Sequence, residues 1–352
     1  MGKRYTANVP SQRITPPEVF FNRRKFLSAF GMGLVAAPLT ARAARGAQAQ
    51  DAIIDVPFQR PDVFPAARNE VYPLPTAISG GGTLGFRRGG QRGDTTPREV
   101  AGAHNNFYEF LSGQGGPVWQ FIGDFEVDPW KVEITGECNN PMTLDLDDLF
   151  AFDHEERLYH FRCVERWAMN VPWSGFPLSR LLEKADPTDR ARFVKFETAQ
   201  VDSQMPGIRE SPWYPWPYQE ALRLDEAMNE LAMVVTGVYG EPLLRQHGSP
   251  IRIIVPWKYG YKNPKSIVKI EFVRDEPKVF WQQTIPHEYG FLSNINPNVP
   301  HPRWPQTGSY WLDTEEPFRT PIFNGYDEYV ADLYPDEPRE MQQPLREGQT
   351  AR

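Results

Sequence analysis

The chain has two cysteines, and their surroundings differ. Cys138 lies in the turn-like segment 136–141, where a small, half-buried side chain is the usual role of an isolated cysteine. Cys163 ends an expected strand and has Arg162 and Arg166 close to it in the sequence. Two arginines near a thiol are expected to lower its pKa and favour the thiolate, which is the form that binds metals or attacks electrophiles. Cys163 is therefore the candidate metal ligand or nucleophile.

Other catalytic patterns are missing from the sequence. It has no G-x-S-x-G elbow, no H-E-x-x-H and no G-x-x-x-x-G-K phosphate loop. Two cysteines also exclude a four-cysteine zinc or iron–sulfur site built from this chain alone. The six histidines lack metal-ligand spacing, so we interpret them as hydrogen-bonded or surface side chains. They are His104, His154, His160, His247, His287 and His301. One activated cysteine without a second protein ligand favours a soft metal that is held partly by an organic cofactor.

The composition is that of a folded, acidic protein. Its 352 residues include 38 Lys+Arg and 45 Asp+Glu, which gives a formal net charge of -7 and argues against a nucleic-acid partner. Hydrophobic residues make up 40% of the chain and charged residues 24%, so a substantial core is expected. The 35 prolines indicate strands joined by many loops, because proline interrupts helices and sheet ladders.

Residues 1–43 have the features of a twin-arginine signal peptide. Arg23 and Arg24 precede a mildly apolar segment, 26–39, that is shorter than the roughly 20 residues of a membrane-spanning helix. Small residues follow and place the expected cleavage between positions 43 and 49. Such a signal is read by the twin-arginine translocase, which exports proteins already folded and often already carrying a cofactor. The expected location is the periplasm.

The remaining sequence predicts an α+β protein. Residues 44–100 are expected to form an irregular N-terminal arm with a Gly/Arg-rich loop, 101–337 a catalytic domain and 338–352 a polar tail. The loop contains a formal G-x-G-x-x-G at 80–85, but it lacks the preceding strand and following helix of a dinucleotide site. The expected strands are 130–134, 157–164, 192–197, 231–236, 251–255 and 265–274, and the expected helices are 145–152, 176–185 and 218–229.

Around Cys163 the sequence resembles the sulfite oxidase family of molybdoenzymes. The resemblance lies in Phe-Arg-Cys-Val-Glu at 161–165 and Val-Pro-Trp-Ser-Gly-Phe-Pro-Leu at 171–178. Further matches lie at 105–110, 255–260, 265–267, 301–304 and 323–326. Along the chain, all of the matched segments have the order that the family shows. More narrowly, the chain is similar to the members that reduce methionine sulfoxide in periplasmic proteins. The resemblance implies a molybdopterin-binding domain of the sulfite oxidase type, with mixed sheets, short helices and many loops.

The same resemblance implies a cofactor and its ligands. It predicts a mononuclear molybdenum bound by the dithiolene of one molybdopterin, with Cys163 as the protein ligand of the metal. Arg252 and Lys265 suit the terminal phosphate of the pterin, the arginine by bidentate bonding and the lysine as a point charge. The positions that correspond to pterin contacts are Asn105, Tyr108, Glu109, Thr198, His247, Arg252, Asn263, Pro264 and Lys265.

Two of these positions depart from the family pattern. His247 stands where relatives often have asparagine, and both side chains can form hydrogen bonds. Asn263 and Pro264 replace a turn that commonly contains glycine. Because Pro264 has no backbone N–H, a contact there must come from Asn263, Lys265 or a carbonyl group.

Glu165 and Asn106 stand where sulfite oxidases place an arginine and a tyrosine. This replacement disfavours sulfite and suits a neutral sulfoxide, so both are candidate catalytic residues and Glu165 a candidate proton donor. An equally weighted alternative makes Glu165 an ion-pair partner of Arg162 or Arg166.

The resemblance predicts repair of oxidised periplasmic proteins by reduction of their methionine sulfoxide. Without a C-x-x-C-H haem motif, the chain is expected to take electrons from a haem-containing membrane subunit. The alternatives are a sulfite dehydrogenase, a reductase of small S- or N-oxides, a metal-free binding protein, and a thiol–disulfide exchanger that uses both cysteines.

Overall fold

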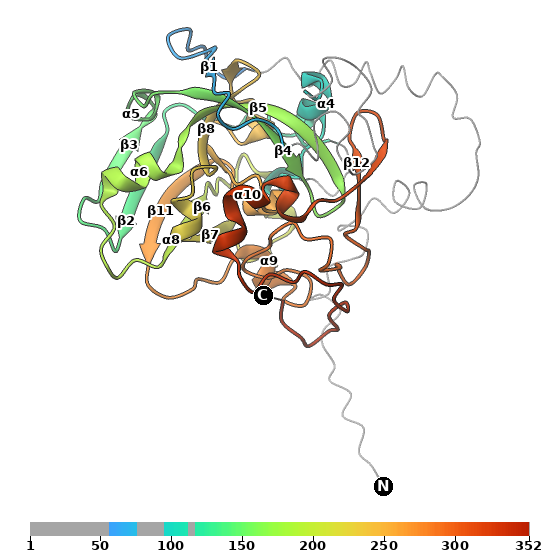
Figure 1. Cartoon of the computed structure of the whole chain (residues 1–352). Coiled ribbons are helices and arrows are strands. Elements are labelled where there is room, and N and C mark those ends of the chain that lie inside the picture. The colour runs from blue at the N-terminus through green and yellow to red at the C-terminus, as the bar shows by residue number, and fades with distance from the viewer. Residues whose placement is uncertain (1–55, 76–94, 112–116, 352) are drawn as a thin grey trace.

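The computed structural model describes residues 56–75, 95–111 and 117–351 (Figure 1). The expected signal peptide and the whole Gly/Arg-rich loop lie outside the described residues. Two sheets dominate the described chain, and its longest helix has only eight residues. The expected α+β class is confirmed. Figure 1 places β2 and β3 of the smaller sheet at one side of the molecule and β12 of the larger sheet at the other.

The larger sheet is built around an antiparallel hairpin, whose first strand ends just before Cys163 and whose second strand begins shortly after it. Its strands β4 (Glu155–Arg162) and β5 (Trp167–Pro177) pair from Arg162 opposite Ala168 to Glu155 opposite Gly175. β5 also pairs antiparallel with β8 (Met233–Val238) and parallel with β12 (Gly308–Trp311). The remaining strands are β1 (Ala67–Arg68), β9 (Glu241–Pro242), β10 (Arg252–Ile254) and β13 (Pro317–Arg319).

The smaller sheet has the strand order β3-β2-β11-β6-β7. β2 alternates buried and exposed side chains, as its sequence predicts for a half-buried strand. The five strands are β2 (Lys131–Gly136), β3 (Met142–Asp145), β6 (Phe193–Thr198), β7 (Gln219–Arg223) and β11 (Ile267–Val273).

The helices are short, and local sequence explains where several of them begin. Asp145 caps one helix through a reciprocal pair of hydrogen bonds with Asp148. Pro177 ends β5 and directly precedes another. The α-helices are α4 (Arg98–Ala103), α5 (Leu146–Phe150), α6 (Leu178–Ala185), α7 (Pro206–Glu210), α8 (Leu224–Ala227), α9 (Phe280–Thr284) and α10 (Asp327–Val330). Single 3₁₀ turns span Tyr108–Phe110, Val118–Gln120, Arg245–His247, Gly260–Lys262, Ile322–Gly325 and Ala331–Leu333.

The helix predicted over 218–229 is wrong. Its first half is strand β7, which pairs with β6 from Arg223 opposite Phe193 to Gln219 opposite Glu197. Only Leu224–Ala227 is helical. Leu, Glu and Arg favour helices locally, but pairing at the sheet edge and burial of Glu220 against Lys262 override that preference.

The sequence also left β5 unpredicted, although this strand is the centre of the larger sheet. All of its residues except Pro177 are buried, so the alternation that marks a half-buried strand is missing. Gly175 permits the close approach of β8, because a Cβ atom there would lie 1.9 Å from the carbonyl oxygen of Val234.

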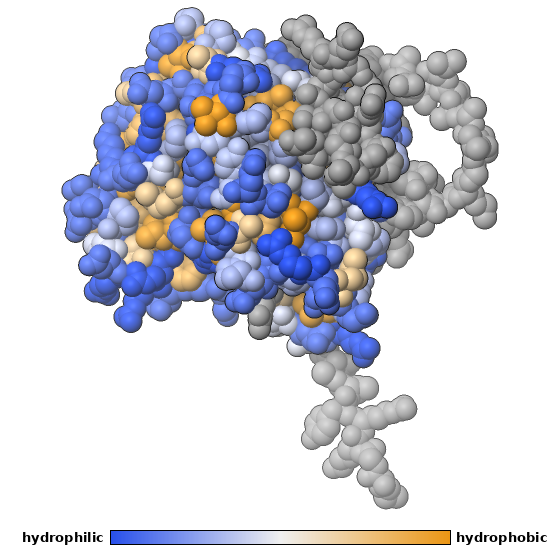
Figure 2. Space-filling view, in the orientation of Figure 1, coloured by the Kyte–Doolittle hydropathy of each residue, from blue (hydrophilic) through white to orange (hydrophobic). Residues whose placement is uncertain are grey.

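One hydrophobic cluster joins the two sheets. Ile134 and Ile270 enter it from the smaller sheet, and Val171 and Val234 enter it from the larger sheet. On the face drawn in Figure 2, hydrophilic side chains predominate and hydrophobic ones form small groups. Within the described residues, no helix has the length and apolar character needed to cross a membrane.

Candidate active site

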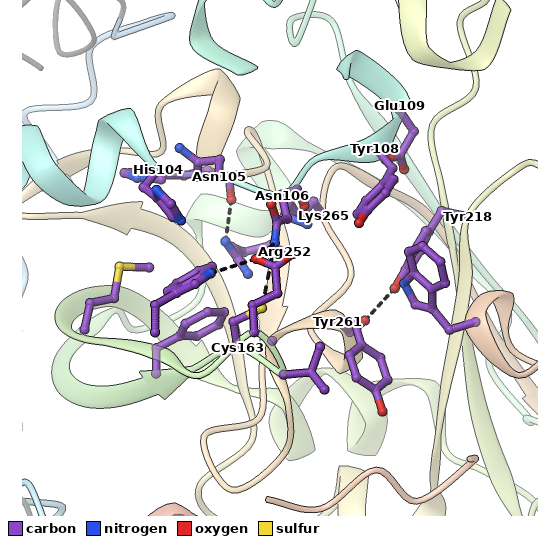
Figure 3. A pocket seen from close by; sticks show the side chains of 18 of the residues that line it. His104, Asn105, Asn106, Tyr108, Glu109, Cys163, Tyr218, Arg252, Tyr261 and Lys265 are labelled. Carbon is purple, nitrogen blue, oxygen red and sulfur yellow. Dashed lines mark hydrogen bonds between the residues drawn. The ribbon is translucent and has the colours of Figure 1, made fainter. Parts of the chain in front are cut away.

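A cavity lies where β4 ends and β5 begins, and it contains most of the predicted site residues. It encloses about 920 Å³ of space that protein atoms do not fill, part of it open to solvent. In Figure 3, His104 and Asn105 lie at one end of this pocket and Tyr218 at the other, with Cys163 between them. The predicted residues that line it are Asn105, Asn106, Tyr108, Glu109, Cys163, Glu165, His247, Arg252 and Lys265.

A tight turn presents Cys163 to the cavity. The backbone N–H of Cys163 donates to the carbonyl oxygen of Trp167 at 3.0 Å, and that of Arg166 donates to the carbonyl oxygen of Cys163 at 2.9 Å. Arg166 has a φ of 77°, in the left-handed region, so that the turn closes within a few residues. Alternate residues of β5, Trp167 and Met169 among them, then face the cavity because side chains of a strand alternate between its faces.

Glu165 is held by two N–H donors on one of its oxygen atoms. Asn106 Nδ2 and Trp167 Nε1 each donate to Glu165 Oε2 at 3.0 Å. The alternative interpretation, an ion pair of Glu165 with Arg162 or Arg166, is not the contact that the structure shows. Arg162 Nε instead donates to Ser309 Oγ at 2.9 Å, and Arg166 Nε donates to the carbonyl oxygen of Gly308 at 2.8 Å.

The expectation that Cys163 has a lowered pKa is wrong for the protein alone. Burial holds the pKa of the Cys163 thiol well above its ordinary value, and the nearby Glu165 carboxylate raises it further. The charge of Arg162 and a hydrogen bond from Asn106 lower the pKa of the thiol, but by less than burial raises it. Asn106 Nδ2 lies 3.7 Å from Cys163 Sγ. A bound metal cation would supply the charge that deprotonates a thiol in this position.

Two cations lie on the cavity wall, Arg252 buried and Lys265 half-buried. Arg252 is 3% exposed, and its Nη1 donates to the carbonyl oxygen of His247 at 2.7 Å. Lys265 Nζ donates to the carbonyl oxygen of Asn106 at 3.0 Å. Burial lowers the pKa of Arg252 to about 9 and is the main cause that lowers the pKa of Lys265 to about 8, with the charge of Arg252 contributing. An anion such as the phosphate of the expected cofactor would offset the free-energy cost of placing these two positive charges away from water.

Glu109, which lines the cavity, forms a hydrogen-bonded pair with Thr198. Thr198 Oγ1 donates to Glu109 Oε1 at 3.1 Å. Burial raises the pKa of Glu109, and the charge of Lys265 partly opposes this. Thr198 itself does not line the cavity, so its contact with the site passes through Glu109.

Asn263 and Pro264 do not line the cavity. Asn263 Nδ2 donates to the carbonyl oxygen of Tyr259 at 3.1 Å, and its Oδ1 accepts from the backbone N–H of Val255 at 2.5 Å. The carbonyl oxygen of Pro264 accepts from the backbone N–H of Ile253 at 3.1 Å. Both residues therefore fix the segment that carries Lys265.

Most of the site residues that the sequence did not identify are aromatic. Trp281 lies between Tyr108 and Tyr289, with ring centroids 4.9 and 5.3 Å away. No sequence signal separates an aromatic residue that lines a cavity from one in the core. The lining residues absent from the predicted set are His104, Phe161, Val164, Trp167, Met169, Trp173, Tyr218, Gly260, Tyr261, Trp281 and Tyr289.

The donor set fits the expected molybdopterin. Among the described residues, no cluster of three His, Cys, Asp or Glu could hold a metal ion. Three cavity residues, Trp173, His247 and Arg252, each keep a buried nitrogen atom without a partner in the part of the chain that the structure describes. Cys138 is a free, half-buried thiol outside the cavity lining.

Comparison with known proteins supplies the family. Residues 120–281 match the family model described as "Oxidoreductase molybdopterin binding domain". The chain is 40% identical over 337 residues to the protein-methionine-sulfoxide reductase catalytic subunit MsrP of Burkholderia mallei (strain ATCC 23344), with 93% of each chain covered. It is also similar to the crystal structure of the sulfane dehydrogenase SoxCD from Paracoccus pantotrophus. That likeness has 17% identity, covers 49% of this chain and 46% of that one, and its TM-score of 0.38 is too low to bear on fold or function. The chain therefore belongs to the family of protein-methionine-sulfoxide reductase catalytic subunits, which are oxidoreductases with a molybdopterin-binding domain.

Proposed function

We propose that this protein reduces methionine sulfoxide in oxidised periplasmic proteins, with molybdopterin-bound molybdenum in the cavity and Cys163 as the protein ligand of the metal. The observation that carries the proposal is the contact of Asn106 with both Glu165 and the Cys163 thiol. It places a carboxyl group and a neutral amide beside the metal ligand. A neutral sulfoxide suits this pair, because neither side chain offers a positive charge to hold the sulfite anion.

The cofactor and the side chains divide the chemistry between them. When bound, molybdenum supplies the two-electron chemistry that removes an oxygen atom from the sulfoxide. The conversion of a sulfoxide to a thioether and water also consumes two protons, which the protein must deliver. Since Oε2 of Glu165 accepts two N–H bonds, Oε1 is the oxygen that is left to carry a proton toward the substrate.

The aromatic residues of the cavity suit the rest of the substrate. Tyr108, Trp281 and Tyr289 pack edge to face or tilted against one another on the lining. Polarizable sulfur groups make favourable contacts with aromatic rings, so these residues would receive the methyl and methylene groups that flank the sulfoxide.

The proposal includes the partners and the location. Electrons come from a membrane donor, in our proposal a haem-containing subunit, and the substrates are periplasmic proteins with oxidised methionines. Residues 1–43 serve as the twin-arginine signal that exports the folded, cofactor-loaded enzyme through the translocase.

The function is tested by two assays of the purified holoenzyme. With a reduced dye as electron donor, we expect reduction of methionine sulfoxide in an oxidised protein. With an oxidised dye as acceptor, we expect little oxidation of sulfite. Efficient sulfite turnover without sulfoxide reduction would overturn the proposal in favour of a sulfite dehydrogenase, and reduction of small sulfoxides or N-oxides alone would overturn the protein-repair role.

A further inference from the structure

Three neighbouring side chains of the cavity lining each keep a nitrogen atom that has no hydrogen-bond partner among the described residues. These atoms are Trp173 Nε1, His247 Nδ1 and Arg252 Nε, and all three are buried. The guanidinium carbon of Arg252 lies 4.9 Å from the centroid of a Trp173 ring. The rings of Trp173 and His247 lie 6.0 Å apart between centroids. A buried polar group that has lost water and gained no partner destabilises the fold, so three neighbouring ones point to a ligand.

The three atoms differ in what they can bind. The indole and the guanidinium nitrogens are donors only. His247 Nε2 lies 3.2 Å from the carbonyl oxygen of Ala101, which only accepts, so Nε2 carries the ring proton. Nδ1 of the neutral ring is then an acceptor. These three side chains therefore offer two donors and one acceptor, a set that matches an oxygen-rich group with an exchangeable proton.

We propose that Trp173 is a binding residue for the cofactor and donates its indole N–H to an oxygen atom of the bound molybdopterin. The inference rests on the cofactor and not on the sulfoxide substrate. Neither the sequence pattern nor the family match distinguished Trp173 from a core residue. Its neighbour Arg252 is the expected phosphate contact, so the acceptor is an oxygen at the phosphate end of the pterin or on the adjoining ring system.

The strand that carries Trp173 suits a fixed donor. Trp173 lies within β5, the central strand of the larger sheet, and is fully buried. Its cross-strand neighbours are Arg157 on β4 and Val238 on β8. A donor on a strand that is paired on both sides keeps its direction better than one on a loop. Its ring also supports the guanidinium of Arg252, so one side chain both donates and orients a second donor.

The test compares Trp173→Phe with the wild type in cofactor-free and cofactor-loaded forms. In the cofactor-free protein, removal of an unpartnered N–H is expected to leave the melting temperature unchanged or raise it. In the loaded enzyme, the same change removes a hydrogen bond and is expected to lower the melting temperature. Changes of opposite sign, or a loss confined to the loaded form, support a cofactor contact. An equal loss in both forms shows a packing role and overturns the proposal.

Trp257→Phe is the matched control. Trp257 is as completely buried as Trp173, but its Nε1 donates to Tyr334 Oη at 2.8 Å and it does not line the cavity. Its replacement should lower the melting temperature equally in both forms.

A second measurement follows cofactor release in moderate urea through the molybdenum and pterin that remain bound. Loss of one hydrogen bond to a charged group is expected to speed release from Trp173→Phe roughly tenfold or more. A release rate equal to that of the wild type overturns the inference.

If Trp173→Phe fails to fold, replacement of the indole by its benzothiophene analogue, which keeps the ring shape and removes only the N–H, gives the same comparison. Absence of pterin from the wild type would overturn the proposed function as well, whereas equal release overturns only the role of Trp173.

Discussion

Asn106 and Glu165 lie 59 positions apart in the sequence and meet with Asn106 Nδ2 3.0 Å from Glu165 Oε2. The same amide nitrogen lies 3.7 Å from Cys163 Sγ. Trp167 Nε1 completes the arrangement with a second hydrogen bond to Oε2. The contact couples the candidate proton donor to the residue that would hold the metal, because one amide group touches both.

Glu165→Gln is expected to lower kcat for sulfoxide reduction by roughly 10²- to 10⁴-fold, the usual contribution of a positioned proton donor. The glutamine oxygen can still accept from Asn106 and Trp167, so molybdenum content should stay at the wild-type level. Steady-state kinetics together with elemental analysis measure both quantities. An unchanged kcat would assign proton delivery to another group.

Trp167→Phe is expected to lower kcat about tenfold, with a smaller effect on KM, because Glu165 loses one of its two donors and with it a fixed orientation. Trp130→Phe serves as the control. The Trp130 indole donates to the carbonyl oxygen of Ile267 at 2.8 Å outside the cavity lining, so this variant should change stability alone. If both variants lower kcat equally, the Trp167–Glu165 contact has no role in positioning.

Lys258→Met is expected to destabilise the fold by about 3–5 kcal/mol, because it leaves a buried carboxylate without its counter-charge. Lys258 Nζ lies 2.7 Å from Glu226 Oε1, and both side chains are almost completely buried. Unfolding in urea measures the loss. The double variant Lys258→Met with Glu226→Gln should recover part of it, and an equal or larger loss in the double variant would contradict the account.

Because of His154, the folded protein is expected to lose stability in acid. Burial lowers its pKa below the ordinary value, and its ring nitrogens contact the carbonyl oxygen of Phe152 and Thr236 Oγ1. The unfolded chain therefore binds more protons at this site as the pH falls through about 6.5, so the contribution of His154 to stability is complete above that pH and declines below it. The stability advantage of the wild type over His154→Gln should shrink between about pH 7.5 and 5 in urea unfolding. A constant difference would show that His154 does not titrate in this way.

The sequence predicted the centre of the site better than its walls. Cys163 and Glu165 follow from a short motif, and the family resemblance adds Asn106 from a distant segment. Trp173 could not be predicted, because a tryptophan in an apolar strand has the same local pattern whether its N–H faces a cavity or the core. The raised pKa of Cys163 also required the structure, since burial outweighs the two arginines that the sequence places beside the thiol.

The prediction of strands and helices from the sequence has the same limit. Strands that alternate, such as 131–136, were predicted from their period. The sequence of β5 does not alternate between apolar and polar residues, because both faces of the strand are buried. Residues 219–223 are of types that favour a helix, and only their pairing with β6 overrides that preference. Both cases depend on contacts with distant segments, which a local pattern does not contain.

The most direct measurement is the intact mass of an oxidised protein after incubation with reductant and each form of the enzyme. We expect the molybdenum-loaded wild type to remove one oxygen atom per accessible methionine sulfoxide. Cys163→Ser should contain little molybdenum and leave the mass unchanged, and Cys138→Ala, which alters the thiol outside the cavity, should act as the wild type. Removal of oxygen by Cys163→Ser at the wild-type rate, or none by a fully loaded wild type, would contradict the account.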